Sequence, residues 1–129
     1  MAKNMAIRAK DENKDEIGSS KTMLALSFWH GVTSTALQKM PVDLSSRQTA
    51  ILLHIYLLPP PHSIKKLAEE IAISKPAICR AVDTLENSKL LRRVRDKHDK
   101  RNVIIQRTVK GSVYLSEFAD IILSMSKDN

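Results

Sequence analysis

The sequence predicts a mainly α-helical domain that carries one small β-hairpin. Apolar residues recur at helical spacing in five segments of the 129-residue chain, whereas two short runs near residue 100 are β-branched or alternating. Hydrophobic residues make up 43% of the chain, which is enough for one packed core, and only 3 Gly and 5 Pro occur. We therefore expect a single domain over residues 21–129, preceded by a mobile, charge-mixed arm at residues 1–20.

The first predicted helix covers residues 21–40 and has a wide apolar face. Leu26, Trp29 and Leu37 follow one helical stripe, and Phe28 extends the apolar surface beyond it. A helix on the surface of a domain needs only one stripe to cover the core. The wider face predicts burial on two sides, against the chain's own core and against a partner subunit.

The second predicted helix covers residues 44–58. Ser45 and Gln48 have the spacing of a capping box, in which each side chain accepts a hydrogen bond from a backbone N–H that the helix leaves free. Three consecutive prolines at residues 59–61 forbid any continuation of this helix.

The third and fourth predicted helices, residues 62–72 and 74–90, are joined by a very short connection. Ser63 and Ser74 are suitable N-caps, and Pro76 is tolerated only in a first helical turn. Two short helices with a tight connection have the form of a helix-turn-helix. On the fourth helix, the side opposite the apolar stripe is predicted to present Lys75, Ala77, Arg80, Asp83 and Thr84.

Residues 90–96 and 103–108 are predicted to form the hairpin, with the charged sequence KHDKRN as its tip. Thr108 is a suitable N-cap for a last helix at residues 109–126. A helix-turn-helix followed by a hairpin is a winged helix, so the full prediction is a winged helix-turn-helix flanked by N- and C-terminal helices. Both flanking helices carry more apolar surface than the core requires, and we expect them to be the dimerisation helices of a homodimer.

The formal net charge is +7, and it is concentrated in one block of the chain. Residues 62–111 hold 13 basic and 6 acidic residues, a net +7, so the rest of the chain is neutral on balance. Such a block favours a polyanionic partner, most often nucleic acid, over a merely solvated charged face. We therefore expect residues 44–111 to be a DNA-binding core, with the fourth helix in the major groove and the hairpin tip toward the minor groove.

The expected DNA contacts follow from these positions. In the major groove or on its phosphates, contacts are predicted from Ser74, Lys75, Ala77 and Arg80. At the hairpin tip they are predicted from Lys97, His98, Lys100 and Arg101, and on phosphates from Ser63 and Arg95. Asp99 stands two residues before Arg101 and is expected to orient that guanidinium in the free protein.

Four stretches of the sequence together resemble one family: LSSRQTAILLHIY, IKKLAEEIAISKPAICRAVDTLENSKLLRR, RDKHDKRNVIIQRT and the KG that follows. They look like the MarR family of bacterial winged helix-turn-helix transcriptional regulators, over roughly residues 44–118. The most specific element is D-x-x-D-x-R, followed by a strand and T-x-x-G. Its residues here are Asp96, Asp99, Arg101, Thr108 and Gly111. The resemblance implies an obligate homodimer, a near-palindromic operator in double-stranded DNA, and usually repression that a small-molecule effector or oxidation relieves.

The chain also departs from the family pattern. Ser88 and Lys89 stand in the turn after the fourth helix, where the family often has a Gly that adopts a left-handed conformation, so some steric cost is expected. Arg107 stands where Leu is common. Relatives commonly have two C-terminal helices in the dimer interface, whereas about one is expected here, so the dimer is expected to differ.

Several other classes of function are not supported by the sequence. No nucleophile, phosphate-binding or metalloprotease motif occurs, so we expect neither an enzyme nor a cofactor. The four histidines lack the spacing of metal ligands. Because Cys79 is the single cysteine of the sequence, a disulfide within the chain is excluded, and its position is more typical of an ordinary buried residue than of a redox sensor. With no apolar secretory segment and no run long enough to cross a bilayer, a cytoplasmic protein without a membrane partner is expected.

Two alternatives to a sequence-specific regulator stay open at this point. A winged helix can serve as a protein-interaction or adaptor module, because a fold does not fix its function. It can also bind DNA without sequence preference. The basic block favours DNA over the adaptor, but it does not distinguish specific from non-specific binding.

Overall fold

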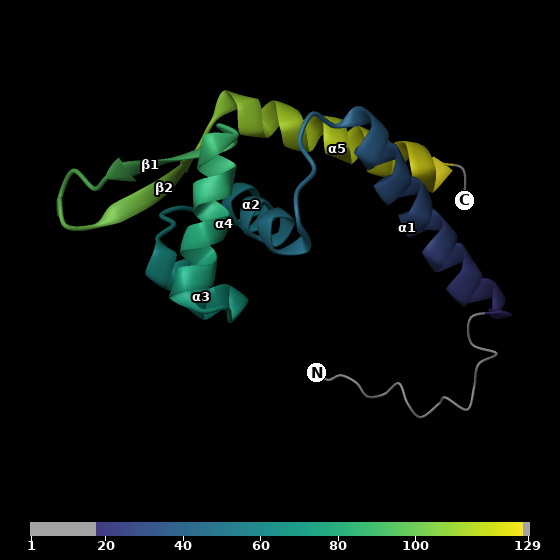
Figure 1. Ribbon diagram of the computed structural model, residues 1–129, viewed down its shortest axis with the longest axis horizontal. Coiled ribbons are helices and arrows are strands. Elements are labelled where there is room, and N and C mark those ends of the chain that lie inside the picture. The colour runs from purple at the N-terminus through teal and green to yellow at the C-terminus, as the bar shows by residue number, and fades with distance from the viewer. Residues whose placement is uncertain (1–17, 128–129) are drawn as a thin grey trace. The chain divides into compact units, whose positions relative to one another are not determined.

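The computed structural model describes residues 18–127, and the predicted arm at residues 1–20 lies almost wholly outside the described residues. Within residues 18–127 the fold is helical apart from one two-stranded hairpin, which confirms the predicted class (Figure 1). In chain order the elements are α1 (Ser20–Lys39), α2 (Ser46–Leu57), α3 (Ile64–Ile71), α4 (Lys75–Asn87), β1 (Leu91–Arg95), β2 (Val103–Arg107) and α5 (Val109–Lys127).

The described residues fall into two compact units. One unit, Met40–Ala119, holds α2, α3, α4, the hairpin and the first part of α5. In it, α2 and α3 pack against α4 and against β2, and α4 packs against β1. The fully buried side chains of this core are Ile51, Leu52, Ile55, Leu67, Ile78, Val82, Leu85, Leu90 and Leu91. Burial of each such side chain contributes about 1.5–3 kcal/mol, so this core fixes the helix-turn-helix and the start of the hairpin together.

The helix starts follow the predicted caps. At α2, the Gln48 N–H donates to Ser45 Oγ at 3.1 Å and the Ser45 N–H donates to Gln48 Oε1 at 2.9 Å, which confirms the capping box. Ser63 and Ser74 each accept a hydrogen bond from the third residue of the helix that follows, at 3.1 and 3.3 Å. These caps satisfy donors that the first turn of a helix leaves free, so each helix begins at a defined residue.

Within residues 18–127, two residues other than glycine have a left-handed backbone. Lys89, with φ of 64°, makes the turn between α4 and β1, whereas the preceding Ser88 is right-handed. The steric cost expected at this turn therefore falls on Lys89. Ala72, with φ of 63°, ends α3 and begins the connection to α4. For residues with a side chain this conformation costs roughly 1–2 kcal/mol each, which the surrounding packing must offset.

The hairpin is antiparallel, with Leu91 opposite Arg107 and Arg93 opposite Ile105. Ser63 forms an isolated bridge with Ile104, and the Ile105 N–H donates to the His62 carbonyl at 2.9 Å. β2 is therefore held on one side by β1 and on the other by the start of the helix-turn-helix.

A tyrosine joins the end of the hairpin to α2. The Tyr56 hydroxyl accepts a hydrogen bond from the Thr108 N–H at 2.9 Å and lies 2.8 Å from the Leu90 carbonyl. Thr108 caps α5 by accepting from the Gly111 N–H at 3.0 Å. A Cβ at Gly111 would overlap the Tyr56 hydroxyl and the Leu90 carbonyl oxygen, so glycine allows this close approach.

Arg107, which stands where the MarR family commonly has Leu, caps the C-terminal end of α2 with its side chain. Its Nε and Nη2 donate to the carbonyls of Ile55 and Leu58 at 2.9 and 3.0 Å. Its guanidinium also lies 5.7 Å from the centre of the Tyr56 ring. The arginine thus satisfies carbonyl groups at a helix C-terminus, which a leucine cannot do.

The second unit contains α1 and the end of α5. A Cβ at Gly31 would come within 2.6 Å of the Met125 sulfur, so glycine permits close packing of these two helices. Val32 is fully buried, yet much of the apolar surface of α1 remains exposed. The exposed large apolar side chains of α1 are Met23, Leu24, Leu26, Trp29 and Leu37. No described helix is both long enough and apolar enough to cross a membrane.

Candidate nucleic-acid interface

The helix-turn-helix presents the start of α4 to solvent. α3 ends at Ile71, and only the left-handed Ala72, Ile73 and the cap Ser74 separate it from α4. Ser74, Lys75 and Arg80 are all exposed, and for Lys75 and Arg80 this agrees with their predicted place on the outer side of the helix. A helix N-terminus with exposed cations nearby favours an anionic ligand, because the helix dipole places partial positive charge there.

Ala77 does not share this exposed surface. Its exposed fraction is 5%, so the expectation that it lies on the outer side of the helix is wrong. Ala77 lies four residues before Ala81, which is 4% exposed, and residues four apart occupy the same side of a helix. Its side chain is therefore part of the packed face, and its N–H serves the Ser74 cap.

The hairpin tip, residues 96–102, projects four charged or titratable side chains into solvent. These side chains are Lys97, His98, Lys100 and Arg101. The Arg101 side chain is 89% exposed. We call residues 96–102 the wing tip.

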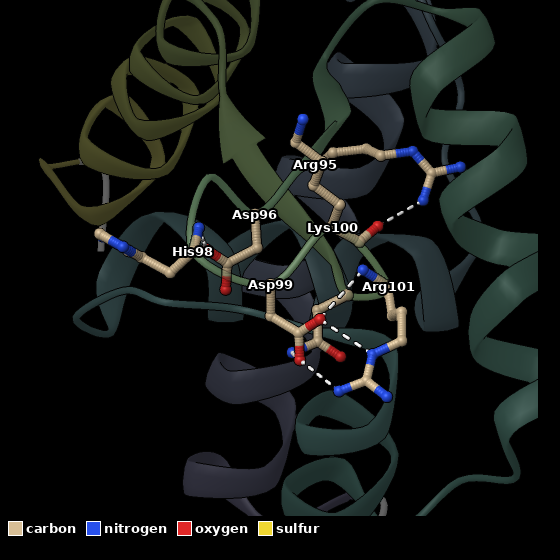
Figure 2. A network of polar contacts seen from close by, with 7 residues as sticks. Arg95, Asp96, His98, Asp99, Lys100 and Arg101 are labelled. Atoms are coloured by element: carbon tan, nitrogen blue, oxygen red, sulfur yellow. Dashed lines mark hydrogen bonds and ion pairs between the residues drawn. The ribbon is translucent and has the colours of Figure 1, made fainter.

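Two carboxylates order the wing tip from within, as Figure 2 shows. Asp99 Oδ1 accepts from the Arg101 N–H and Nε, both at 3.1 Å, and Asp99 Oδ2 accepts from Nη2 at 3.3 Å. Asp96 Oδ1 accepts from the His98 N–H at 2.9 Å. The side-chain and backbone hydrogen bonds from Arg101 lower the pKa of Asp99. The acidic residues thus bind the tip's own donors, while its cations extend outward.

Arg95, predicted as a phosphate contact, also closes the wing tip. Its Nη1 donates to the Lys100 carbonyl at 2.6 Å (Figure 2). The Asp96 N–H donates to the Asn102 carbonyl at 3.0 Å. Together these bonds fix the two ends of the loop. The Arg95 side chain is exposed, so its other guanidinium donors remain directed toward solvent.

Ser63, the other predicted phosphate contact, is half-buried at the start of α3. Its Oγ accepts from the Lys66 N–H at 3.1 Å, which leaves the hydroxyl proton for a further acceptor. Capping and a phosphate contact are therefore chemically compatible at this residue.

One charged cluster was missed by reasoning from the sequence. Arg93 of β1 donates through Nη2 to Asp83 at 2.6 Å, and through Nη1 to Glu86 at 2.7 Å. Its backbone N–H also donates to Glu86 at 3.0 Å. Burial alone would lower the pKa of Arg93, but the hydrogen bonds to Asp83 and Glu86 raise it above its ordinary value. We call these three residues the wing base.

Two other titratable side chains considered from the sequence, Cys79 and His54, lie outside the wing tip and the wing base. Cys79 is a half-buried free thiol in α4, and His54 is bonded to Glu70 of α3 at 2.7 Å. Within residues 18–127, no three His, Cys, Asp or Glu side chains form a group that could hold a metal ion.

The helix-turn-helix of α3 and α4, with the hairpin after it, defines a winged helix-turn-helix protein. Residues 42–102, from just before α2 through the wing tip, match the sequence model of the MarR family. This match, over somewhat less than half of the chain, confirms the resemblance to the MarR family that was inferred from its motifs. Because that family consists of transcriptional regulators, the expectation that the chain is not an enzyme is confirmed as well.

Solved structures have the same fold. The transcriptional regulator BldR from Sulfolobus solfataricus is 27% identical, with a TM-score of 0.60 over 95% of this chain and 84% of that one. MepR from S. aureus, solved as a complex with DNA, is 20% identical, with a TM-score of 0.70 over 82% of this chain and 84% of that one. YusO from Bacillus subtilis is 16% identical, with a TM-score of 0.73 over 94% of this chain and 83% of that one.

Proposed function

We propose that this protein is a homodimeric, sequence-specific regulator of transcription that binds double-stranded DNA, most simply as a repressor in the cytoplasm. The observation that carries the proposal is the arrangement of the wing tip. Its carboxylates bind the loop's own donors, while Lys97, His98, Lys100 and Arg101 extend into solvent. Outward lysine and arginine side chains on an ordered loop suit a phosphate backbone or a narrow minor groove, where negative potential is concentrated.

The proposed division of contacts follows from position. Ser74, Lys75 and Arg80 of α4 would read or flank the major groove, with Arg80 the most direct candidate for base contact. The wing-tip cations would contact the backbone or the minor groove, with Asp99 holding Arg101 in one orientation. Ser63 and Arg95 would bind phosphates beside the helix and the wing. Ala77 has no exposed side chain to contribute.

The comparisons support DNA as the partner by analogy. MepR, which shares the fold, has been solved in complex with DNA, and another MepR structure is bound to an oligodeoxyribonucleotide. At 20% identity this likeness shows only the fold, so DNA as the partner of this chain is proposed by analogy. The exposed cations of this chain's own α4 and wing carry the rest of the proposal.

A second copy of the chain is the partner proposed for α1 and α5. On α1, Leu26 and Trp29 are each 50% exposed and Leu37 is 66% exposed, and on α5 Leu123 is 59% exposed. Soluble monomers rarely leave this much apolar surface open. A two-fold dimer would present two copies of α4 to two half-sites, about one turn of DNA (~34 Å) or a multiple of it apart, so the operator would be near-palindromic.

Selection from a pool of random duplex DNA tests this function. The expected result is an enriched near-palindrome that the protein binds at least about 1000-fold more tightly than random competitor DNA. The affinity should fall steeply as the salt concentration rises. Each phosphate that the protein neutralises contributes about −0.9 to the slope of the logarithm of the binding constant against the logarithm of the salt concentration. Recovery of no preferred sequence, with salt-dependent binding retained, would indicate an architectural DNA binder. Absence of any DNA binding would favour the adaptor function.

The quaternary proposal has its own measurement. Sedimentation at micromolar concentration should show a dimer, and substitution of Trp29 and Leu37 by polar residues should shift it toward monomer. A clean monomer that binds a single half-site would contradict both the dimer and the palindrome.

A further inference from the structure

We propose that Arg93 is a positioning residue for DNA recognition, because it fixes the wing relative to α4 so that both can engage one site. This inference rests on the function proposed above. It assigns to the wing base a role in binding, although none of its three residues needs to touch DNA.

The wing base joins two elements that carry different contacts. Arg93 lies at the middle of β1, two residues before Arg95, the last residue of the strand. Its partners Asp83 and Glu86 lie three residues apart on α4, so both carboxylates lie on the same side of that helix. Asp83 is in turn three residues after Arg80, the proposed base-contacting residue. One guanidinium therefore connects the strand that carries the wing tip to the helix that would enter the groove.

The fork of the guanidinium suits this connection. Nη1 and Nη2 each bind a different carboxylate, and the Arg93 backbone N–H binds the second oxygen of Glu86. This geometry fixes the distance and the direction between β1 and α4, which a lysine, with a single point charge, does not do. Among the described residues, every hydrogen bond that the side chains of these two elements make to each other involves Arg93.

The hydrophobic core alone does not position the outer part of the wing. Leu91 and Ile105 are buried, but Val94, Val103 and Ile104 are only partly buried, and the residues of the loop lie further out. Apolar packing therefore holds the hairpin up to about Arg93, and beyond this residue the charged contacts of Arg93 position the wing. Loss of Arg93 should leave the hairpin folded and leave the wing tip free to move relative to α4.

A double-mutant cycle on DNA affinity tests this role. The cycle compares wild type, Arg93→Gln, Arg101→Ala and the double variant on the selected operator at fixed salt. If Arg93 positions the wing, Arg93→Gln should weaken binding by roughly tenfold, and Arg101→Ala should then add much less than it does in wild type. A variant that merely lowered stability would leave the Arg101 effect unchanged at temperatures well below its unfolding transition.

The neighbouring arginine supplies a matched control. Arg92 lies on the same strand, is exposed, and bonds only Gln106 across the hairpin, at 3.1 and 3.2 Å. Arg92→Gln removes the same charge as Arg93→Gln. The fold-changes in DNA affinity caused by Arg92→Gln and by Arg101→Ala should be independent, so the double variant should show their product. If Arg93→Gln behaves like Arg92→Gln in this cycle, the positioning role is wrong.

A second variant covers the case in which Arg93→Gln does not fold. The combined change Asp83→Asn with Glu86→Gln disconnects the wing while keeping Arg93, and it should also reduce the Arg101 effect. If this variant binds DNA more tightly with the full Arg101 effect, the carboxylates act only through their charge and the inference is overturned. If wild type binds no DNA, the proposed function itself fails, so the two failures are distinguishable.

Discussion

The wing base and the wing tip pair the same chemical groups in different settings. At the base, the Arg93 side chain is 28% exposed, and its partners come from another element. At the tip, the Arg101 side chain is 89% exposed, and its partner Asp99 is two residues away in the same loop. An exposed pair contributes little to stability, because solvent screens it. The comparison indicates that the base holds the architecture, whereas the tip pre-orients a side chain for a partner.

The largest effect on stability is expected in the core next to the wing base, at Ile105. Ile105 is 2% exposed and lies opposite Arg93 on β2. Ile105→Ala should lower the free energy of unfolding by about 2–5 kcal/mol, because it removes buried carbon atoms and leaves a cavity. Chemical denaturation measures this cost. Val103→Ala, a half-buried position on the same strand, is the matched control and should cost clearly less. Equal costs at the two positions would contradict the proposed boundary of the core.

At the wing tip the expected effect is on binding and not on folding. Arg101→Ala should weaken operator binding by about 1–3 kcal/mol and leave the free energy of unfolding unchanged, because it removes a proposed DNA contact and no core atom. Asp99→Ala should act in the same direction but less, through loss of orientation. Salt-matched titrations with denaturation of the same samples provide the measurement. Unchanged affinity in Arg101→Ala would remove the wing tip from the interface.

At the wing base, unlike at the wing tip, substitution should lower the free energy of unfolding. Arg93→Gln should lower the free energy of unfolding by about 1–2 kcal/mol, because Asp83 and Glu86 lose a partly buried, charge-assisted partner. Arg92→Gln should change it by less than about 0.5 kcal/mol, as expected for an exposed pair. If the two variants unfold at the same denaturant concentration, the distinction between base and tip does not hold for stability.

Features that depend on residues close together in the sequence could be predicted, whereas features that depend on tertiary packing could not. Ser45, Ser63 and Ser74 were predicted as caps because a cap depends on residues within one helical turn. The pairing of Asp99 with Arg101 could be expected for the same reason, since both lie in one short loop. The wing base could not be, because it requires the register of the hairpin and the packing of β1 on α4. Two acidic residues three apart on a helix, followed by an arginine-rich strand, were the only sequence signal for it.

One wrong prediction, at Ala77, and one feature that was not predicted, at Ala72, have physical causes as well. Ala77 was placed on the outer side of α4, but it lies at the edge of the apolar stripe, where a small side chain fits on either side. The left-handed backbone at Ala72 was not anticipated, because alanine carries no preference for that conformation. In both cases packing by α2, α3 and α4 decides what the residue type leaves open.

The smallest expected effect is a pH dependence of stability that arises beside the wing base and not at the tip. His62 is 3% exposed, and its carbonyl accepts from the Ile105 N–H of β2. Burial lowers the pKa of His62, and the nearby His54, Arg107 and Lys66 lower it further, against a hydrogen bond to the Leu58 carbonyl that raises it.

Because the folded pKa of His62 lies below the unfolded value of 6.5, the unfolded state binds more protons as the solution is acidified. The stability contribution of His62 is therefore fully present above about pH 6.5 and is lost as the pH falls through the lower folded pKa. His62→Gln should flatten this loss in denaturation curves measured between about pH 7.5 and pH 5. That variant keeps both His54 and Glu70, so the difference between the two curves reports the loss of His62 together with its interaction with His54. His98→Gln at the wing tip is the control and should leave the curve unchanged, because His98 is exposed. If His62→Gln loses stability with acid as steeply as wild type, then the acid sensitivity lies elsewhere and His62 does not couple the hairpin to pH.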